Sequence, residues 1–173
     1  MIAHDPSVVE VWVGPVSKYQ EFFAPLGELT ITFSMLEQQL SNAIRILCSL
    51  SYRETADLDW LSPEGRIKRF KRDALRVATV PELRAEIPKL VDALDDARNR
   101  RNNAQHGPWL MGLEQTESAP KIDLRKNPVE WRDHTPTSIH EDAVFCFRVS
   151  LSMASWTGRF ITEERVLRKN MST

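Results

Sequence analysis

The chain has 173 residues, enough for one domain with a substantial buried core. Its 42% hydrophobic and 27% charged residues are typical of an ordinary soluble globular protein. The 23 Lys and Arg residues almost balance the 24 Asp and Glu residues, which leaves a net charge of −1. This composition excludes a protein held on nucleic acid by its bulk charge, but not one with a local basic patch.

The sequence also predicts a compartment. The first ten residues, MIAHDPSVVE, have neither the basic nor the apolar part of a signal peptide. No apolar run approaches the roughly 18–20 residues of a membrane span. Cys48 and Cys146 lie far apart among apolar neighbours, which indicates two buried thiols rather than a disulfide or metal pair. We therefore expect a cytoplasmic protein without a membrane segment.

Apolar residues spaced three and four apart predict two helices in the first half of the chain. The first covers about residues 16–47, and we expect Pro25 and Gly27 to kink or divide it. The second begins with Ser62 as its N-cap, and Pro63 takes the first helical position.

The same spacing predicts two more helices in the second half. The third starts near Pro81 or Pro88 and ends at Gly107, a residue that suits a helix C-terminus. The fourth begins at Ser138, and Glu141 three residues later completes a capping-box pattern.

Between these last two helices, residues 108–136 contain four prolines and only short apolar segments. This composition predicts a small β-hairpin or an extended insertion. We therefore predict a single all-α domain over residues 1–173, a four-to-five-helix up-and-down bundle with a short β-hairpin insertion between the last two long helices.

The end of the third helix has an unusual polarity. On a helical wheel its apolar stripe, formed by Leu83, Ile87, Leu90, Val91 and Leu94, continues into polar residues over the last two turns. Arg98, Arg101 and Gln105 fall inside the same arc, Asn102 lies just beyond it, and His106 lies further round. Because an unpaired buried charge is costly, this end should face a cleft, a partner subunit or a bound anion.

These residue types suit phosphate chemistry. Arginine offers a permanent forked charge, and histidine moves protons near neutral pH. Asparagine orients either of them by hydrogen bonding. The alternative interpretation is an interface or core network in which His106 caps the C-terminus of the helix.

The segment Arg101-Asn102-Asn103-Ala104-Gln105-His106 resembles the R-[polar]-x3-H motif of the HEPN superfamily of helical-bundle proteins. The Gly107-Pro108-Trp109 that follows, and Phe33-Ser34-x-Leu36-Glu37 in the first long helix, are also similar to patterns of that group. The resemblance in helix order covers roughly residues 16–168.

The resemblance implies a metal-independent endoribonuclease without a cofactor, in which the RNA 2′-hydroxyl attacks the neighbouring phosphate. It implies His106 as general acid or base, Arg101 as the phosphate ligand and Asn102 as a positioning residue. It further implies a homodimer with a composite site, and a toxin or defence role on tRNA or other RNA that an antitoxin would neutralise.

Four further residues are candidates for substrate contact: Arg98, Arg100, Gln105 and Trp109. Arg100 also fits the looser spacing of the motif, so the choice of functional arginine among Arg98, Arg100 and Arg101 stays open.

Glu37 lies at the edge of the first buried stripe, about 40° from Phe33. It is a candidate site-supporting residue that would pair with Arg98 or Arg101; the alternative is an ordinary carboxylate that reaches solvent.

The run from Arg66 to Arg76 holds six cations and one anion, Asp73. It is either an RNA-backbone track or a solvated helix face. His134 and His140 do not have metal-ligand spacing, so we predict no metal site.

Two other functions compete with the nuclease. A catalytically silent HEPN-like module would dimerise and bind a nucleotide, RNA or a protein partner through the same residues. A plain helical interaction domain unrelated to HEPN would need neither activity.

Overall fold

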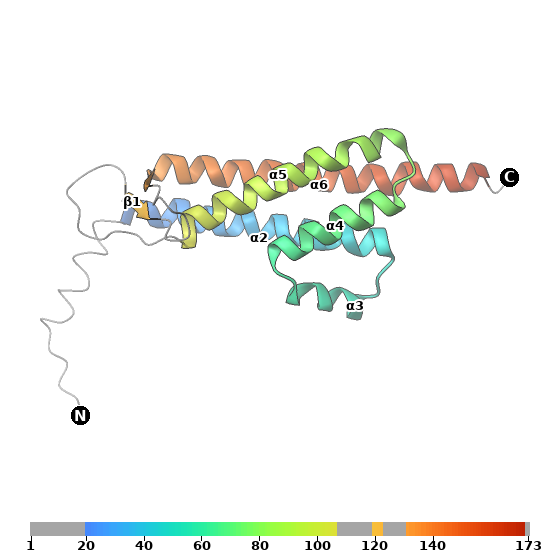
Figure 1. Ribbon diagram of the computed structural model, residues 1–173, viewed down its shortest axis with the longest axis horizontal. Coiled ribbons are helices and arrows are strands. Elements are labelled where there is room, and N and C mark those ends of the chain that lie inside the picture. Colours follow the sequence, from blue (N-terminus) through green and yellow to red (C-terminus); the bar gives the residue numbers. More distant parts are fainter. Residues whose placement is uncertain (1–19, 107–118, 123–130, 172–173) are drawn as a thin grey trace, which may run out of the picture.

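The computed structural model of the chain describes residues 20–106, 119–122 and 131–171 (Figure 1). These residues form a helical bundle with one pair of short strands, which confirms the predicted all-α class. The long helices are α2 (Gln20–Cys48), α4 (Pro63–Val77), α5 (Pro81–His106) and α6 (Pro136–Met171); two short helices, α3 (Tyr52–Ala56) and η1 (Asp57–Trp60), join α2 to α4. None of the helices described here has a stretch long and apolar enough to cross a membrane.

Three of the four long helices run in the same direction. Figure 1 shows α2, α4 and α6 running one way along the bundle and α5 running back. Near the start of both α2 and α6, Glu28 pairs with His140, so these two helices lie parallel. The predicted up-and-down order is therefore wrong between α2 and α4, because α3 and η1 carry the chain back to about the middle of α2, where Arg66 of α4 meets Glu37, so that α4 runs in the same direction as α2.

Local capping explains where two of the helices begin. The predicted start of α4 is confirmed, because the Ser62 hydroxyl accepts a hydrogen bond from the Gly65 amide at 3.1 Å. The predicted start of α6 at Ser138 is two residues late, because the helix begins at Pro136. Thr135 and Ser138 instead form a reciprocal cap at the start of the helix. The Ser138 amide donates to the Thr135 hydroxyl, and the Thr135 amide donates to the Ser138 hydroxyl, both at 3.0 Å.

The predicted break at Pro25 and Gly27 does not occur, since α2 runs continuously through both residues. Pro25 lies in the second turn of the helix, where it removes a single backbone hydrogen bond, to the carbonyl of the exposed Glu21. Water can satisfy that carbonyl. Gly27 is exposed with open space around it, so it costs helix propensity without disrupting a contact.

The core is tied together by Trp156 on α6. Its ring packs edge-on against Phe70 of α4 at 5.4 Å and stacks on Phe160 at 5.6 Å, and its indole nitrogen donates to the Leu83 carbonyl of α5 at 3.1 Å. Both cysteines are free thiols, as predicted, but only Cys146 is buried; Cys48 is partly exposed, so its predicted burial is wrong. Cys146 is fully buried, and burial raises its pKa to about 12, so it stays protonated at neutral pH.

The two strands, β1 (Ala119–Ile122) and β2 (Trp131–His134), pair antiparallel with Ala119 opposite His134. They fall within the predicted insertion, residues 108–136. The connection that would make them a hairpin lies outside the described residues, so the hairpin itself stays a prediction.

The end of α2 has one strained residue, Ser49, whose φ of 51° places it in the left-handed region. It follows the last helical residue, and the next amide, that of Leu50, donates to the Arg45 carbonyl at 2.9 Å, as in a Schellman cap. Glycine is the residue that adopts this conformation without steric cost.

We therefore expect Ser49→Gly to raise the free energy of unfolding by about 0.5–1 kcal/mol, measured by urea denaturation. Ser34→Gly is the matched control, because Ser34 is exposed inside α2 and should lose about 0.5 kcal/mol on the same change. Equal effects at the two positions would contradict this account of the cap.

Candidate functional site

The polar end of α5 lies against the first half of α2. The Gln105 side-chain amide donates to the Thr30 hydroxyl at 2.5 Å. The Arg101 guanidinium lies 5.5 Å from the centre of the Phe33 ring, within the range of a cation–π contact, and donates to the side-chain oxygen Oδ1 of Asn102 at 3.1 Å. Three of the predicted site residues are therefore brought together beside α2.

Arg98 continues this polar surface one turn earlier, where the first turn of α4 meets α5. Its guanidinium lies 3.4 Å from the carboxylates of both Glu64 and Asp95, and it donates to the Asn99 side chain at 3.3 Å. The side chain is only 21% exposed, and its Nε atom is buried with no hydrogen-bond partner among the described residues. Arg98 therefore joins α4 to α5 at the edge of the polar end.

Arg100 points to the other side of α5. It pairs with Asp96 at 3.1 Å and with Asp142 of α6 at 2.9 Å, and its guanidinium lies 4.3 Å from the centre of the Phe145 ring. Burial lowers the pKa of Arg100, but the hydrogen bonds with Asp142 and Asp96 outweigh it and the net pKa is raised. Arg100 thus fastens α5 to α6, whereas Arg98 and Arg101 face α4 and α2.

The expected pairing of Glu37 with Arg98 or Arg101 is not observed. Glu37 lies instead 3.5 Å from Arg66 of α4. Arg66 also donates to the backbone carbonyls of Leu58 and Asp59, at 3.0 and 3.3 Å, so it anchors η1 as well. The expectation placed the partner of Glu37 on the wrong helix, because the sequence did not show that α4 inserts beside α2 at this level.

The basic run of α4 is largely engaged within the fold. Asp73 is 1% exposed, and three arginines converge on its carboxylate: Arg72 at 3.0 Å, Arg69 at 3.3 Å and Arg76 at 3.7 Å. The Cys48 thiol also donates to it at 3.2 Å. This buried carboxylate accounts for three of the six cations in the basic run of α4.

Burial alone would raise the pKa of Asp73. Hydrogen bonds from Arg72 and Cys48, together with the charges of Arg72 and Arg69, outweigh that effect and hold the pKa below its usual range. Asp73 is therefore ionised at neutral pH in spite of its burial.

Two predicted site residues lie beyond what the structure describes in full. His106 is the last residue of α5, and its side chain lies outside the described part, as does the whole of Trp109. The backbone places His106 about 7.5 Å along the helix axis from Arg101. No group of three metal-binding side chains occurs among the described residues.

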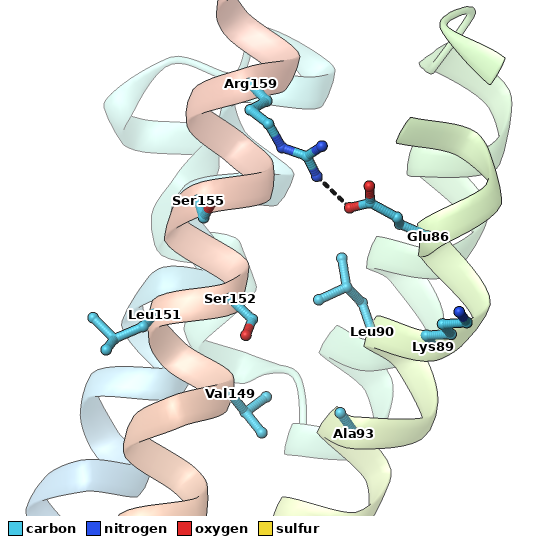
Figure 2. A pocket seen from close by; sticks show the side chains of 9 residues that line it. All are labelled: Glu86, Lys89, Leu90, Ala93, Val149, Leu151, Ser152, Ser155 and Arg159. Carbon is cyan, nitrogen blue, oxygen red and sulfur yellow. Dashed lines mark hydrogen bonds and ion pairs between the residues drawn. The ribbon is translucent and has the colours of Figure 1, made fainter. Parts of the chain in front are cut away.

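A groove of about 550 Å³ lies elsewhere, between α5 and α6 (Figure 2). Figure 2 shows Arg159 of α6 reaching across to Glu86 of α5, with which it forms an ion pair. The lining residues are Glu86, Lys89, Leu90, Ala93, Val149, Leu151, Ser152, Ser155 and Arg159, and none of them belongs to the predicted site.

Thr30 and Glu64, which hold Gln105 and Arg98, were missed by the sequence reasoning. Nothing in their local sequence indicates a role at the site. Thr30 is one of several polar residues on α2, and Glu64 is an acidic residue in the first turn of α4, where such residues are common.

No family model, curated protein or solved structure matches this chain. The HEPN resemblance therefore rests on the residues of α5 and α2 and stays a prediction.

Proposed function

We propose that this chain is a metal-independent endoribonuclease of the HEPN type, acting on tRNA or other RNA as a toxin or defence component. The observation that carries the proposal is the gathering of Arg101, Asn102 and Gln105 beside α2, directly before His106 at the end of α5. A helix whose core-facing stripe ends in these residue types is suited to hold a phosphate.

In the proposed reaction the 2′-hydroxyl of one nucleotide attacks the adjacent phosphorus. The bond from phosphorus to the 5′-oxygen breaks, which leaves a 2′,3′-cyclic phosphate and a 5′-hydroxyl. His106 takes the proton from the nucleophile or supplies one to the leaving oxygen, and Arg101 balances the charge that develops on the phosphate.

Among the three arginines, we assign the phosphate to Arg101. Arg100 is committed to Asp96 and Asp142, and Arg98 is shared between Glu64 and Asp95. Arg101 has the spacing from His106 that the motif requires, and it contacts Phe33 and Asn102 beside α2.

The test is to incubate the wild type and two variants, His106→Ala and Arg101→Ala, with total RNA and with tRNA in the presence of EDTA. We expect the wild type to leave cyclic-phosphate ends and each variant to be slower by roughly 100-fold or more. Lys89→Ala is the matched control, an exposed cation on the same helix that lies outside the site. Unchanged cleavage by His106→Ala, or loss of cleavage in EDTA, would contradict the mechanism.

A second candidate is the catalytically silent module that binds RNA, a nucleotide or a protein partner such as an antitoxin. It is favoured by the pairing of Arg98 with two carboxylates and of Arg66 with Glu37, which reduces the positive charge available for phosphate. RNA that stays intact but binds the wild type more tightly than Arg101→Ala would identify this function.

A further inference from the structure

The basic run of α4 is not used by the site at the end of α5. Residues 64–76 contain six cations and two carboxylates. One of the cations, Arg66, points inward to Glu37 of α2, which leaves five cations against two carboxylates and a net charge of +3. The whole chain has a net charge of −1. A local excess of positive charge on a chain that is negative overall indicates a surface for an anionic ligand.

Three of these cations form a continuous ridge on the outer side of α4. Lys68, Arg72 and Arg76 are four residues apart, so each follows the last by about 6 Å along the helix axis and about 40° around it. Their side chains are 75%, 67% and 67% exposed, whereas Ile67 and Phe70 are buried against the bundle. We call these three residues the α4 ridge. Their spacing is close to the separation of successive phosphates along one strand of a nucleic acid.

The buried Asp73 holds two of the ridge side chains in place. Arg72 donates through Nε to the carboxylate at 3.0 Å, and a terminal nitrogen of Arg76 lies 3.7 Å from it. A guanidinium has five N–H donors, so both side chains keep donors for a ligand outside the protein. An arginine that is already held in one orientation loses less conformational freedom when it binds. The ridge is therefore arranged for an anion before the anion arrives.

The ridge leads to the site on α5 through Glu64. The Glu64 carboxylate lies 2.6 Å from Lys68 and 3.4 Å from Arg98 of α5. From this junction α4 runs one way for about 18 Å to Arg76, and α5 runs the other way for about 12 Å to His106 (Figure 1). The ridge and the proposed catalytic end thus share a line of about 30 Å. A stacked strand covers that length with about nine nucleotides at roughly 3.4 Å each.

The ridge has no surface on which bases could stack. The one aromatic residue between positions 64 and 76, Phe70, is fully buried. Proteins hold single-stranded nucleic acid by stacking its bases on aromatic side chains as well as by contacting its backbone. A base-paired RNA stem hides its bases and presents phosphates and 2′-hydroxyls. A row of cations without an aromatic platform therefore suits a stem better than a single strand.

We propose that the α4 ridge binds the phosphate backbone of a base-paired RNA stem, so that the substrate is a structured RNA and not a short single strand. This inference rests on the proposed function, because it takes RNA as the ligand of the site on α5. The stem lies along α4, and the nucleotides joined to it reach the end of α5 beyond Arg98. Because the ridge contacts the backbone alone, it adds affinity without reading the base sequence.

The test measures binding of the full chain to two 2′-O-methyl RNAs by fluorescence anisotropy. One RNA is a stem-loop of about ten base pairs, and the other is an unpaired strand of equal length. The 2′-O-methyl group removes the nucleophile of the proposed reaction, so binding is measured without cleavage. We expect the wild type to bind the stem-loop roughly 10-fold or more tightly than the single strand.

Lys68→Gln and Arg76→Gln remove one ridge cation each. We expect each variant to raise the Kd for the stem-loop by roughly 3- to 10-fold and to reduce the slope of log Kd against log salt concentration by about 1. Lys68 lies outside the Asp73 cluster, so its replacement leaves that cluster intact. Circular dichroism and urea denaturation check that Arg76→Gln, which lies closer to Asp73, is folded.

Two control variants keep the ridge intact. Lys89→Gln removes an exposed lysine of α5 that lines the groove between α5 and α6. Trp60→Ala removes an aromatic side chain on η1 that is 90% exposed. We expect both to change the Kd for the stem-loop by less than about 2-fold. A loss in Trp60→Ala larger than that in Lys68→Gln would indicate base stacking and overturn the stem as ligand, and so would equal binding of the two RNAs.

The outcomes separate this inference from the nuclease. If the wild type cleaves tRNA but Lys68→Gln and Arg76→Gln bind the stem-loop as the wild type does, the ridge is not the stem site and the nuclease stands. If the ridge variants lose affinity as expected but the wild type leaves unmodified RNA intact, the nuclease fails and the ridge stands. A wild type that binds neither RNA, or an equal loss in Lys89→Gln, overturns the ridge.

Discussion

Replacing Asp73 with asparagine is expected to lower the free energy of unfolding at neutral pH by about 3 kcal/mol. The carboxylate is 1% exposed and accepts charge-assisted hydrogen bonds from Arg69 and Arg72, with Arg76 close by. Asparagine fits the same space but leaves three arginines facing one another without a counter-charge. Urea denaturation measures the loss, and Asp92→Asn, an exposed aspartate on α5, is the control expected to change stability by less than about 0.5 kcal/mol.

The same site predicts the direction of a pH dependence. Because the pKa of Asp73 is lowered in the folded state, its contribution is fully present above about pH 4, the usual pKa of an unfolded aspartate. It is lost as the pH falls through the lower, folded-state pKa, since the unfolded chain takes up the proton first. The stability difference between wild type and Asp73→Asn should therefore shrink between pH 7 and about pH 3; a constant difference would contradict the ionised state.

Glu164→Ala is expected to cost a similar amount, about 2–4 kcal/mol, through the start of α5. Glu164 is 4% exposed on α6, and its carboxylate accepts from the amides of Thr79 and Val80, at 2.6 and 3.2 Å, and from the Thr79 hydroxyl. The Arg84 amide donates to the Val80 carbonyl, so Val80 stands at the N-cap position with a side chain that cannot cap. Glu164 instead accepts from the amides of the N-cap residue Val80 and of the residue before it, and it places a negative charge at the positive end of the helix dipole.

Hydrogen exchange shows where in the structure Glu164→Ala acts. In Glu164→Ala we expect the amides of the first turn of α5 to exchange faster, while Glu164→Gln, which keeps an acceptor but no charge, should lose about 1 kcal/mol. Glu141→Ala, an exposed glutamate on the same helix, is the control. Uniform exchange along α5 in Glu164→Ala would mean that the carboxylate does not act as a cap.

The parts of the fold that the sequence predicted are those governed by local physics. Ser62 followed by Pro63 predicts the start of α4 because a cap needs only neighbouring residues. The start of α6 was misplaced because Thr135 and Ser138 also form a reciprocal cap, and the pattern of Ser138 with Glu141 competed with it.

The polar end of α5 was likewise visible in the sequence, since Arg98, Arg101 and Gln105 continue the arc of an apolar stripe. That reasoning could not distinguish Arg100 from its neighbours, because both sides of α5 carry arginine here. Only the packing of α6 brings Asp142 and Phe145 to Arg100, and only the packing of α2 brings Phe33 to Arg101.

The sequence by itself determined the all-helical class, the length of the core stripes and the residue types available for chemistry at the end of α5. Tertiary structure alone decided which groups the charged side chains meet. Glu37 and its partner Arg66 are 29 residues apart, and Glu164 and its partner Thr79 are 85 residues apart. The physical reason is that helix periodicity and capping act within a few residues, whereas a charged side chain is paired by whichever helix packs against it. The parallel course of α2 and α6 is set in the same way, by the path of the chain between them.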